Sequence, residues 1–546
     1  MIRVKKLPYG LKTRCAINIP KHVSSCNAFA LGFIILGLIL NFSSAFSQVK
    51  DMERPNVIII LADDMGYGDV SFNNPYSRTK TPNIDKMIEK GINFTDAHSG
   101  GSVCTPSRYG LITGRYYFRV PAHNGYLGYL SPLIENGRET IGSLMQKAGY
   151  TTACIGKWHL GLSWALKDLD SPQISSTNKT VTNTNFQKNI SGGPNSLGFN
   201  YSYILPASLD MPPYVFVKNN KVIDPEVILT ADAYPHTLNE TVPVWDRKYT
   251  STNDVYWERG VWWRNGEMSR SFKMENCLDT IVNEGIMFIE NQVKNNPQKP
   301  FILYLPLTGP HTPWMPNAKF KGASALGTYG DFILQIDHVV EQINSTLKSL
   351  KIDNNTIVIF SSDNGAAWAE DDIQVYEHQS NWNKRGQKGD IWDGGHHIPL
   401  IIQWPSKIKK GFTYTSTVGL VDLLATFSEL TGQPIEKAYG EDSFSFYKVL
   451  SGVSNAPVRD NIIYISSANV LAIKKDQWKF IDGLGSGGFT APANLKPVKG
   501  GPKGQLYNLE KDPLESNNLY LQFPEKVKEL SALLDNLKKQ GFSKQI

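Results

Sequence analysis

The stretch that decides the fold is Cys104-Thr105-Pro106-Ser107-Arg108-Tyr109-Gly110-Leu111-Ile112-Thr113-Gly114-Arg115. Cys104 stands where a helix N-cap is expected, and Pro106 occupies an early helical position that suits a residue without an N–H. Arg108 follows Cys104 by four residues and so lies over the same helix face. The helix N-terminus and Arg108 both favour negative charge beside Cys104. From spacing alone, Cys104 is either a reactive thiolate or an inert buried thiol that precedes a helix.

The whole stretch resembles the signature of the type I sulfatases, which is long and seldom arises by chance. In that family a Cys followed by x-Pro-Ser-Arg and a downstream Thr-Gly-Arg is oxidised to formylglycine. The resemblance implies an alkaline-phosphatase-like α/β fold with a central, mostly parallel sheet flanked by helices. It also implies a smaller C-terminal subdomain, built from an antiparallel sheet and a helix, and a maturase partner that converts Cys104 to formylglycine.

The first 47 residues have the composition of a secretory signal peptide. They contain six Lys or Arg and no acid, followed by an apolar run from Ala28 to Leu40 and small residues near Ser47. This order of segments predicts cleavage before Gln48 and a secreted or periplasmic chain. Because the apolar run is short for a membrane span, we expect no transmembrane anchor after cleavage. The formal net charge of +6 lies entirely in this segment. The neutral remainder gives no reason to expect a nucleic acid partner.

The order of apolar patterns predicts two domains after the signal peptide, an α/β domain over residues 48–440 and an α+β subdomain over residues 441–546. In the first, the expected strands are 54–61, 151–155, 301–305 and 356–360, and the expected helices are 81–91, 139–150, 275–292, 330–350 and 420–431. In the second, the expected strands are 461–466, 470–474, 478–482 and 505–509, and the expected helix is 524–539.

Acidic and amide side chains follow two of the expected buried strands. Asp63 and Asp64 come after the first strand, and Asp363 and Asn364 come after the last strand of the α/β domain. Open α/β sheets place ligand-binding groups at such carboxyl ends. Four oxygen ligands without thiolate or imidazole favour Ca²⁺ or Mg²⁺ over zinc. The resemblance implies one divalent ion, usually Ca²⁺, that holds sulfate oxygens beside the formylglycine.

Four further side chains match positions of the family pattern. Lys157 and His159 follow an expected strand in Gly-Lys-Trp-His, and they share one face of the chain if it stays extended. His311 lies between two prolines, and Lys388 lies in a loop rich in glycine and cations. The resemblance implies that both lysines bind sulfate oxygens and neutralise charge that grows in the transition state.

The resemblance also assigns the nucleophile and the proton transfers. The hydrate of the formylglycine made from Cys104 would supply the nucleophilic hydroxyl, and Arg108 would stabilise this hydrate. His311 would protonate or contact the leaving sugar oxygen. His159 would take the proton from the remaining hydroxyl, which expels sulfate and restores the aldehyde.

Other residues have no fixed role in the family pattern. We regard His123, His396 and His397 as candidates for substrate contact only. Cys154 and Cys277 either pair in a disulfide or remain two buried thiols.

Residues 163–270 read as a long irregular insertion, rich in Ser, Thr, Asn and Pro. Its aromatic side chains either shape a glycan subsite or pack the insertion itself; they include Trp245, Trp257, Trp262 and Trp263.

These features predict a secreted sulfatase that acts on a sulfated carbohydrate. One alternative keeps the fold and hydrolyses phosphomonoesters or phosphonates, but a two-metal phosphatase needs a second set of His and Asp ligands that the sequence does not offer. Another alternative is a catalytically silent protein that binds sulfated glycans and never oxidises Cys104; such a protein has no need for both His159 and His311. The Cys104 stretch is similar to that of bacterial sulfatases assigned to 6-O-sulfated galactose or N-acetylgalactosamine.

Overall fold

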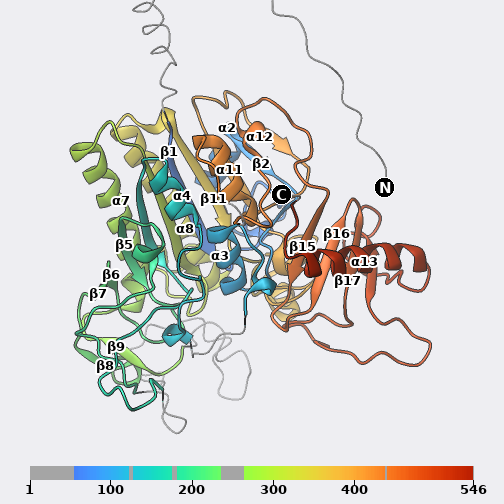
Figure 1. Ribbon diagram of the computed structural model, residues 1–546, viewed down its shortest axis with the longest axis horizontal. Helices are drawn as coiled ribbons and strands as arrows, with labels where there is room; N and C mark the ends of the chain where they lie inside the picture. The colour runs from blue at the N-terminus through green and yellow to red at the C-terminus, as the bar shows by residue number, and fades with distance from the viewer. Residues whose placement is uncertain (1–53, 122–126, 175–180, 235–262, 437–438, 545–546) are drawn as a thin grey trace, which may run out of the picture. The chain divides into compact units, whose positions relative to one another are not determined.

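The structure is a computed structural model that describes residues 54–121, 127–174, 181–234, 263–436 and 439–544. The predicted signal peptide and His123 lie outside these residues. The largest element is a ten-stranded sheet (Figure 1). Its strand order is β13 (Phe412–Tyr414), β2 (Ile92–Phe94), β12 (Leu400–Gln403), β11 (Thr356–Ser362), β1 (Asn56–Asp63), β10 (Phe301–Pro310), β4 (Thr151–Lys157), β5 (Tyr201–Leu205), β6 (Val217–Lys218) and β7 (Lys221–Val222).

Strand β1 lies between β11 and β10 in a run of five parallel strands, β11-β1-β10-β4-β5. Its residue Ile59 pairs with Ile359 on one side and Tyr304 on the other. Val57 packs into the core on one face and Ile58 into the core on the opposite face, and both are fully buried. A continuous apolar strand is what a sheet covered on both faces requires, so the predicted central parallel sheet is confirmed.

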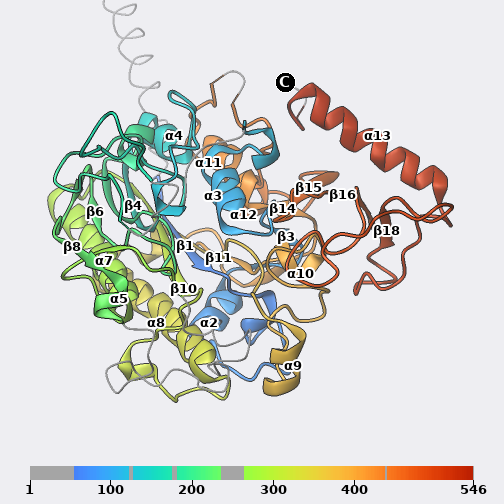
Figure 2. The same cartoon turned by 90° about the horizontal axis from the view of Figure 1, so that it is seen from below.

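Helices cover both faces of this sheet (Figure 2). One face carries α3 (Cys104–Thr113), α4 (Ile141–Lys147) and α11 (Leu423–Thr431). The other face carries α2 (Pro82–Lys90), α7 (Cys277–Asn295) and α8 (Gly327–Ser349). Each helix expected from the sequence is present, with ends within a few residues of the expectation. None of the described helices has the length and apolar composition needed to cross a membrane.

A second, smaller sheet follows in the C-terminal part of the chain. It is antiparallel and has the order β15 (Asn461–Ile465), β16 (Leu471–Lys475), β17 (Trp478–Ile481) and β18 (Gln505–Asn508). Helix α13 (Pro524–Gln540) buries Leu530 and Leu534 in the same apolar cluster as Ile463 and Ile473 of the sheet. The predicted small sheet with one helix is confirmed. Residues 55–546 form one compact unit, and we propose that the subdomain begins near residue 441.

The insertion at residues 163–270 is more regular than the sequence indicated. Strand β5 extends the main sheet in parallel, and β8 (Val227–Leu229) and β9 (Glu267–Ser269) form a separate antiparallel pair. These strands are short and β5 contains a serine, which hid their periodicity. Trp263 is 4% exposed and packs against Tyr234, so it fills the insertion rather than a glycan subsite. Trp245, Trp257 and Trp262 lie outside the described residues.

The described cysteines are all buried and unpaired. Cys154 lies in β4 and Cys277 is the first residue of α7. Burial raises the pKa of both thiols. Of the two alternatives that the sequence left open, the structure therefore shows separate thiols and no disulfide between them.

A buried ion-pair cluster joins the small sheet to the segment between β11 and β12 of the main sheet. Lys479 Nζ of β17 lies 2.8 Å from Asp393 Oδ1 and 2.9 Å from Glu515 Oε1. Asp393 begins the short helix α10 (Asp393–His396). Burial opposes the charge on Lys479, but the two carboxylates outweigh it and raise the pKa of the ammonium group.

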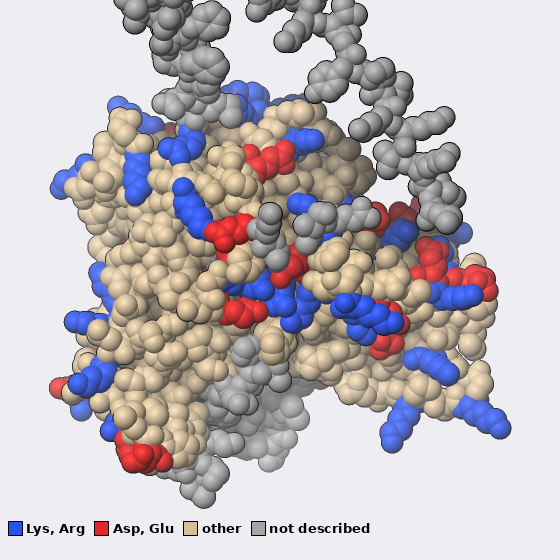
Figure 3. Space-filling view, in the orientation of Figure 1, with Lys and Arg blue, Asp and Glu red and all other residues tan. Residues whose placement is uncertain are grey.

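At the surface the charges are mixed, and Lys and Arg lie among Asp and Glu on the face shown in Figure 3.

We predict that Lys479→Met destabilises the protein by about 3–5 kcal/mol, because it leaves two buried carboxylates without their cation. Urea unfolding followed by circular dichroism measures the loss. Lys475→Met on the neighbouring strand is the matched control. The Lys475 ammonium is 33% exposed, lies 3.8 Å from Glu529, and should contribute less than about 1 kcal/mol. Equal losses in the two variants would contradict a stabilising role for the buried cluster.

Candidate active site

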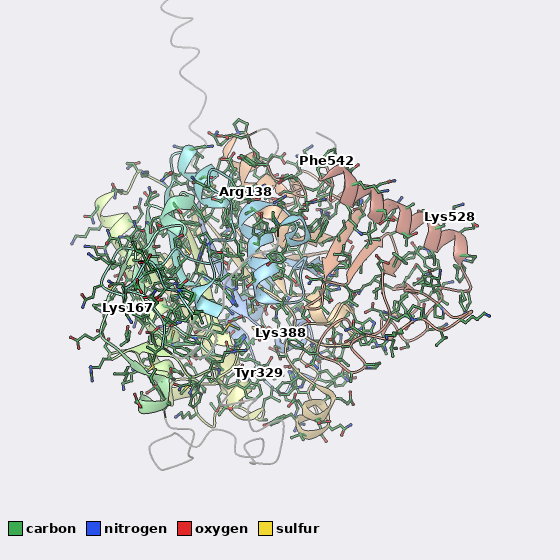
Figure 4. The ribbon with its side chains drawn as sticks, turned by 60° about the horizontal axis from the view of Figure 1, so that its bottom comes forward. Arg138, Lys167, Tyr329, Lys388, Lys528 and Phe542 are labelled. Carbon is green, nitrogen blue, oxygen red and sulfur yellow. The ribbon has the colours of Figure 1, made fainter. Side chains whose placement is uncertain are left out.

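The polar residues predicted from the sequence meet at the carboxyl edge of the main sheet. Most of them lie at the end of a strand or directly after it. Asp63 ends β1, Lys157 ends β4, His311 comes directly after β10, and Asp363 comes directly after β11. Because these strands are parallel neighbours, their carboxyl ends converge. Lys388 comes from the loop between β11 and β12 and lies near the centre of the molecule in Figure 4.

Four oxygen-bearing side chains form the floor of the site. Asp63, Asp64, Asp363 and Asn364 are all at most 4% exposed. The Asp64 backbone N–H donates to Asp363 Oδ1 at 3.2 Å, and Asn364 Nδ2 donates to Asp64 Oδ1 at 2.7 Å. Asn364 Oδ1 is buried and accepts no hydrogen bond from any described residue. Buried hard oxygens with an amide oxygen in need of a partner fit a Ca²⁺ or Mg²⁺ ion.

Backbone geometry brings the second carboxylate into this floor. Asp64 adopts φ +67°, in the left-handed region where Asp is tolerated better than most residues. Its side chain thereby lies beside Asp363 and Asn364 rather than continuing the alternation of β1. Side-chain atoms of Asp63, Asp64, Cys104 and His311 all lie within 4.8 Å of one another.

Three cations balance the three carboxylates. Lys157 Nζ lies 2.7 Å from Asp63 Oδ2, and Lys388 Nζ lies 2.7 Å from Asp64 Oδ2. The Arg108 guanidinium lies 2.7 Å from Asp363 Oδ2 and 3.4 Å from Asp63 Oδ1; these two contacts tie the second turn of α3 to the ends of β11 and β1.

The pKa values of the floor reflect this balance of burial against charge. Burial opposes ionisation of Asp64, but Lys388 and its neighbouring cations outweigh burial and lower the pKa of this carboxyl. Burial likewise opposes ionisation of Asp63, and Lys157 leads the cations that lower its pKa. Both carboxylates are therefore ionised at neutral pH.

Cys104 differs from the expectation in two respects. Val103 is the N-cap and Cys104 is the first helical residue of α3. The thiol is not stabilised as a thiolate, since burial, together with Asp363 and Asp63, raises its pKa well above the usual value despite Lys157 and Lys388. Burial is the largest cause, and the nearby carboxylates add to it, since Cys104 Sγ lies 3.4 Å from Asp63 Oδ1.

The two histidines of the cluster have different surroundings. His311 Nδ1 lies 2.6 Å from the Thr312 carbonyl and so carries a proton, whereas Nε2 faces Asp64 Oδ2 at 3.6 Å. His159 lies beside the start of α3, where Thr105 Oγ1 donates to its carbonyl at 3.3 Å. Burial, and then the charges of Lys157 and other cations, lower the pKa of His159 well below its usual value. A neutral imidazole there is able to accept a proton.

His396 and His397 do not join the cluster. His396 is fully buried, stacks on Tyr464 with ring centroids 3.8 Å apart, and lies 3.1 Å from His98 between their Nδ1 atoms. His397 is 3% exposed and stacks on Tyr67 at 4.5 Å. Burial lowers the pKa of both imidazoles well below the usual value. The contacts of His396 fit packing against the small sheet and those of His397 fit packing against Tyr67, and a role of either in substrate contact stays a prediction.

Two site residues were missed in the sequence. Ser208 Oγ lies 3.1 Å from Lys157 Nζ, and Asp210 Oδ1 lies 3.8 Å from His311 Nδ1. Both lie in the segment that leaves β5, whose strand was not predicted. A polar residue after the run Tyr-Ile-Leu was the one available signal.

Sulfatases match most of the length of this chain. A sulfatase family model matches residues 55–433. The N-acetylgalactosamine-6-O-sulfatase of Bacteroides thetaiotaomicron is 33% identical over 514 residues, which cover 90% of this chain and 94% of that protein. The N-acetylgalactosamine-6-sulfatase of Mus musculus is 31% identical over 388 residues, which cover 70% of this chain and 63% of that protein.

Solved structures share the fold. One, described with the metabolism of multiple glycosaminoglycans by Bacteroides thetaiotaomicron, has a TM-score of 0.74 at 31% identity and covers 89% of this chain and 100% of its own. The phosphonate monoester hydrolase of Agrobacterium radiobacter has a TM-score of 0.54 at 16% identity, covers 90% of this chain and 96% of its own, and indicates the fold alone. By the family match, the identities and the shared fold, the chain belongs to the sulfatase family.

Proposed function

We propose that this sulfatase hydrolyses O-sulfate esters of a saccharide, with a formylglycine made from Cys104 as the nucleophile and one divalent cation held by Asp63, Asp64, Asp363 and Asn364. The observation that carries the proposal is the position of Cys104, whose Sγ lies 3.4 Å from Asp63 Oδ1 in the cluster of balanced charges. Ca²⁺ suits the oxygen ligands, with Mg²⁺ as the alternative. The saccharide we favour is a 6-O-sulfated N-acetylgalactosamine or galactose, since the 33% identical relative is an N-acetylgalactosamine-6-O-sulfatase.

Charge supports an anionic ester as the ligand. Lys157, Lys388 and Arg108 offset the three carboxylates, so one divalent ion would leave a net charge of about +2 in a buried site. The ion supplies positive charge for sulfate oxygens when it is bound. A sulfate monoester is an anion, and negative charge shifts onto its oxygens and its leaving oxygen during S–O cleavage. Fixed cations therefore stabilise the transition state more than the ground state.

The first chemical step forms a covalent sulfate ester. One hydroxyl of the hydrate at position 104 gives its proton to Asp63, whose Oδ1 lies 3.4 Å from Cys104 Sγ, and attacks sulfur, while the bond from sulfur to the sugar oxygen breaks. Lys157 and Lys388 hold the sulfate oxygens, and Arg108 holds the carboxylate of Asp363 beside the nucleophile. The sugar oxygen leaves as the alcohol after it receives a proton from His311 Nε2, the nitrogen that faces the cluster.

The second step restores the aldehyde without attack of water on sulfur. His159, which is neutral because of its low pKa, takes the proton of the remaining hydroxyl. The electron pair of that O–H bond forms the C=O bond, and the C–O bond to sulfate breaks. Water then rehydrates the aldehyde, Asp63 and His159 release their protons to the solvent, and His311 takes one up.

The alternatives lack a supporting observation. Among the described residues, a single group of His, Cys, Asp and Glu side chains is arranged to hold a metal, so the second ion of a two-metal phosphatase has no counterpart there. A glycan-binding protein without activity would need neither an imidazole that protonates the leaving oxygen nor an imidazole that accepts a hydroxyl proton. We also propose that residues 1–47 are removed near Ser47 on export to the periplasm or the medium, and that a maturase of the host converts Cys104.

We predict that Cys104→Ala lowers turnover of 4-nitrophenyl sulfate by about 10⁶-fold, the size of loss expected when an enzyme loses its nucleophile. Its melting temperature should stay close to that of the wild type. Cys277→Ala removes a different buried thiol and is the matched control, which should keep the activity. Mass spectrometry of the wild-type peptide should show loss of sulfur at position 104. Normal turnover by the Cys104→Ala variant would exclude the mechanism.

We predict that chelation removes activity and lowers the melting temperature, because three crowded carboxylates lose a ligand that binds only the folded state. Ca²⁺ or Mg²⁺ at about 100 times its Kd should restore about 2.7 kcal/mol of stability. Differential scanning calorimetry measures the shift. Asp363→Ala should abolish the response to metal, whereas Asp353→Asn, at an exposed acid before β11, should keep it. An unchanged melting temperature after thorough chelation would show that the ligand assignment is wrong.

We predict that the two histidines separate by leaving group. An alkoxide needs a proton far more than a phenolate does, so His311→Ala should depress desulfation of a saccharide much more than hydrolysis of 4-nitrophenyl sulfate. His159→Ala should depress both reactions and let the sulfated enzyme accumulate. Intact-protein mass spectrometry after brief exposure to substrate detects this adduct. Accumulation in the His311 variant alone would mean that the two roles are reversed.

A further inference from the structure

Asp210 and Arg264 form an ion pair beside His311. Asp210 lies five residues beyond the end of β5, and Arg264 lies three residues before β9. Arg264 Nη1 lies 2.6 Å from Asp210 Oδ2, and the Arg264 backbone N–H donates to the Asp210 carbonyl at 3.0 Å. The Tyr214 hydroxyl donates to the Arg264 carbonyl at 2.7 Å. The pair is therefore held by backbone and side-chain contacts and has a defined geometry.

The two members of the pair differ in depth. The side chain of Asp210 is 2% exposed, whereas that of Arg264 is 30% exposed. Asp210 also approaches the catalytic cluster, since its Oδ1 lies 3.8 Å from His311 Nδ1. Arg264 therefore lies nearer the solvent, and Asp210 lies between it and the imidazole.

One carboxylate oxygen of Asp210 has no donor. Its Oδ1 is buried, and within the part of the chain that the structure describes no group donates a hydrogen bond to it. His311 Nδ1 does not fill this need, because that N–H is directed to the Thr312 carbonyl at 2.6 Å. A buried carboxylate oxygen without a donor is costly, and a ligand hydroxyl would remove the cost.

The orientation of His311 indicates which part of a bound sugar would reach this oxygen. Its two nitrogens face opposite neighbours, Nε2 toward Asp64 at 3.6 Å and Nδ1 toward Asp210 at 3.8 Å. If Nε2 serves the leaving sugar oxygen, the carbon atoms beyond that oxygen extend past the imidazole toward Asp210. A carboxylate accepts from an O–H and a guanidinium donates to its oxygen, so the pair suits neutral hydroxyl groups. Asp210 also disfavours a second sulfate at this position.

We propose that Asp210 and Arg264 bind ring hydroxyl groups next to the sulfated carbon, and thus select the sugar while the cluster holds the sulfate. The inference rests on the proposed function and names the residues that determine its specificity. Aryl sulfates have no such hydroxyl groups. A site built to bind a hydroxyl rejects analogues that lack it, because its buried polar groups are then left unpaired.

The test compares four substrates with the activated enzyme: N-acetylgalactosamine 6-sulfate, its 3-deoxy and 4-deoxy analogues, and 4-nitrophenyl sulfate. Asp210→Ala should lower kcat/KM for the parent sugar about 100-fold, the effect of losing a hydrogen bond to a charged group. Its loss of kcat/KM for 4-nitrophenyl sulfate, which has no hydroxyl group for Asp210 to bind, should be much smaller than its loss for the sugar. The wild type should lose about 100-fold on one deoxy analogue, and Asp210→Ala should not distinguish that analogue from the parent.

Three further variants complete the design. Asp210→Asn keeps the shape of the side chain and replaces Asp210→Ala in the test if that variant does not fold. It should also reduce the ratio of kcat/KM between the parent sugar and the deoxy analogue, by a smaller factor. Arg264→Gln should also lower kcat/KM for the parent sugar. Arg270→Gln is the matched control, since Arg270 belongs to the same insertion and forms an exposed pair with Glu226 at 3.7 Å, and its kcat/KM values should match those of the wild type.

The inference is overturned if the Asp210 variants lose the same factor on the parent and on both deoxy analogues, because Asp210 then acts only through His311. An equal loss on 4-nitrophenyl sulfate overturns it as well. If the wild type prefers another sulfated saccharide, the deoxy analogues of that saccharide take the place of these. If the wild type turns over no sulfate ester at all, the proposed function fails and this inference fails with it.

Discussion

Three carboxylates meet in the interior of this protein, and the structure around them depends on the need to balance their charge. Asp63, Asp64 and Asp363 are buried together because two neighbouring parallel strands, β1 and β11, end at one edge of the sheet. Charges of one sign in a buried site cannot be tolerated without partners. The cations that balance them come from a helix, a third strand and a distant loop. Packing of α3 and of the loop around Lys388 against the strand ends is thus an electrostatic requirement as well as an apolar one.

Much of this arrangement could be predicted from the sequence. The β1 segment is a continuous run of apolar, β-branched residues that ends in two acids, and the β11 segment ends in an acid and an amide. Such runs indicate strands covered on both faces, and parallel neighbours bring their ends together. The helices were predictable from the spacing of their apolar residues, as for Ile84, Met87 and Ile88 in α2.

Other parts of the site depend on contacts between residues far apart in the chain, which no local pattern reports. Ser208 and Asp210 follow β5, a five-residue strand without a clear period, so nothing marked them as neighbours of Lys157 and His311. The pKa of the Cys104 thiol is raised by burial and by Asp363 and Asp63, which are distant in sequence, so the local pattern of a Cys before a helix did not report it. His396 lies near Lys388 in sequence, yet it is buried against Tyr464 of the small sheet.

The junction around Lys479 has a consequence for comparing genes in this family. Every side chain that we place in the chemistry lies before residue 389, so a shortened relative that stops after the main sheet would still pass a search for catalytic residues. Its Asp393, five residues beyond Lys388, would have lost the ammonium group of Lys479, and the Asp393 backbone N–H would have lost Glu515 Oε2 at 2.6 Å. The loop that presents Lys388 would then lack its anchor. An intact reading frame through the last hundred residues therefore says as much about whether a relative is an active enzyme as the signature around position 104 does.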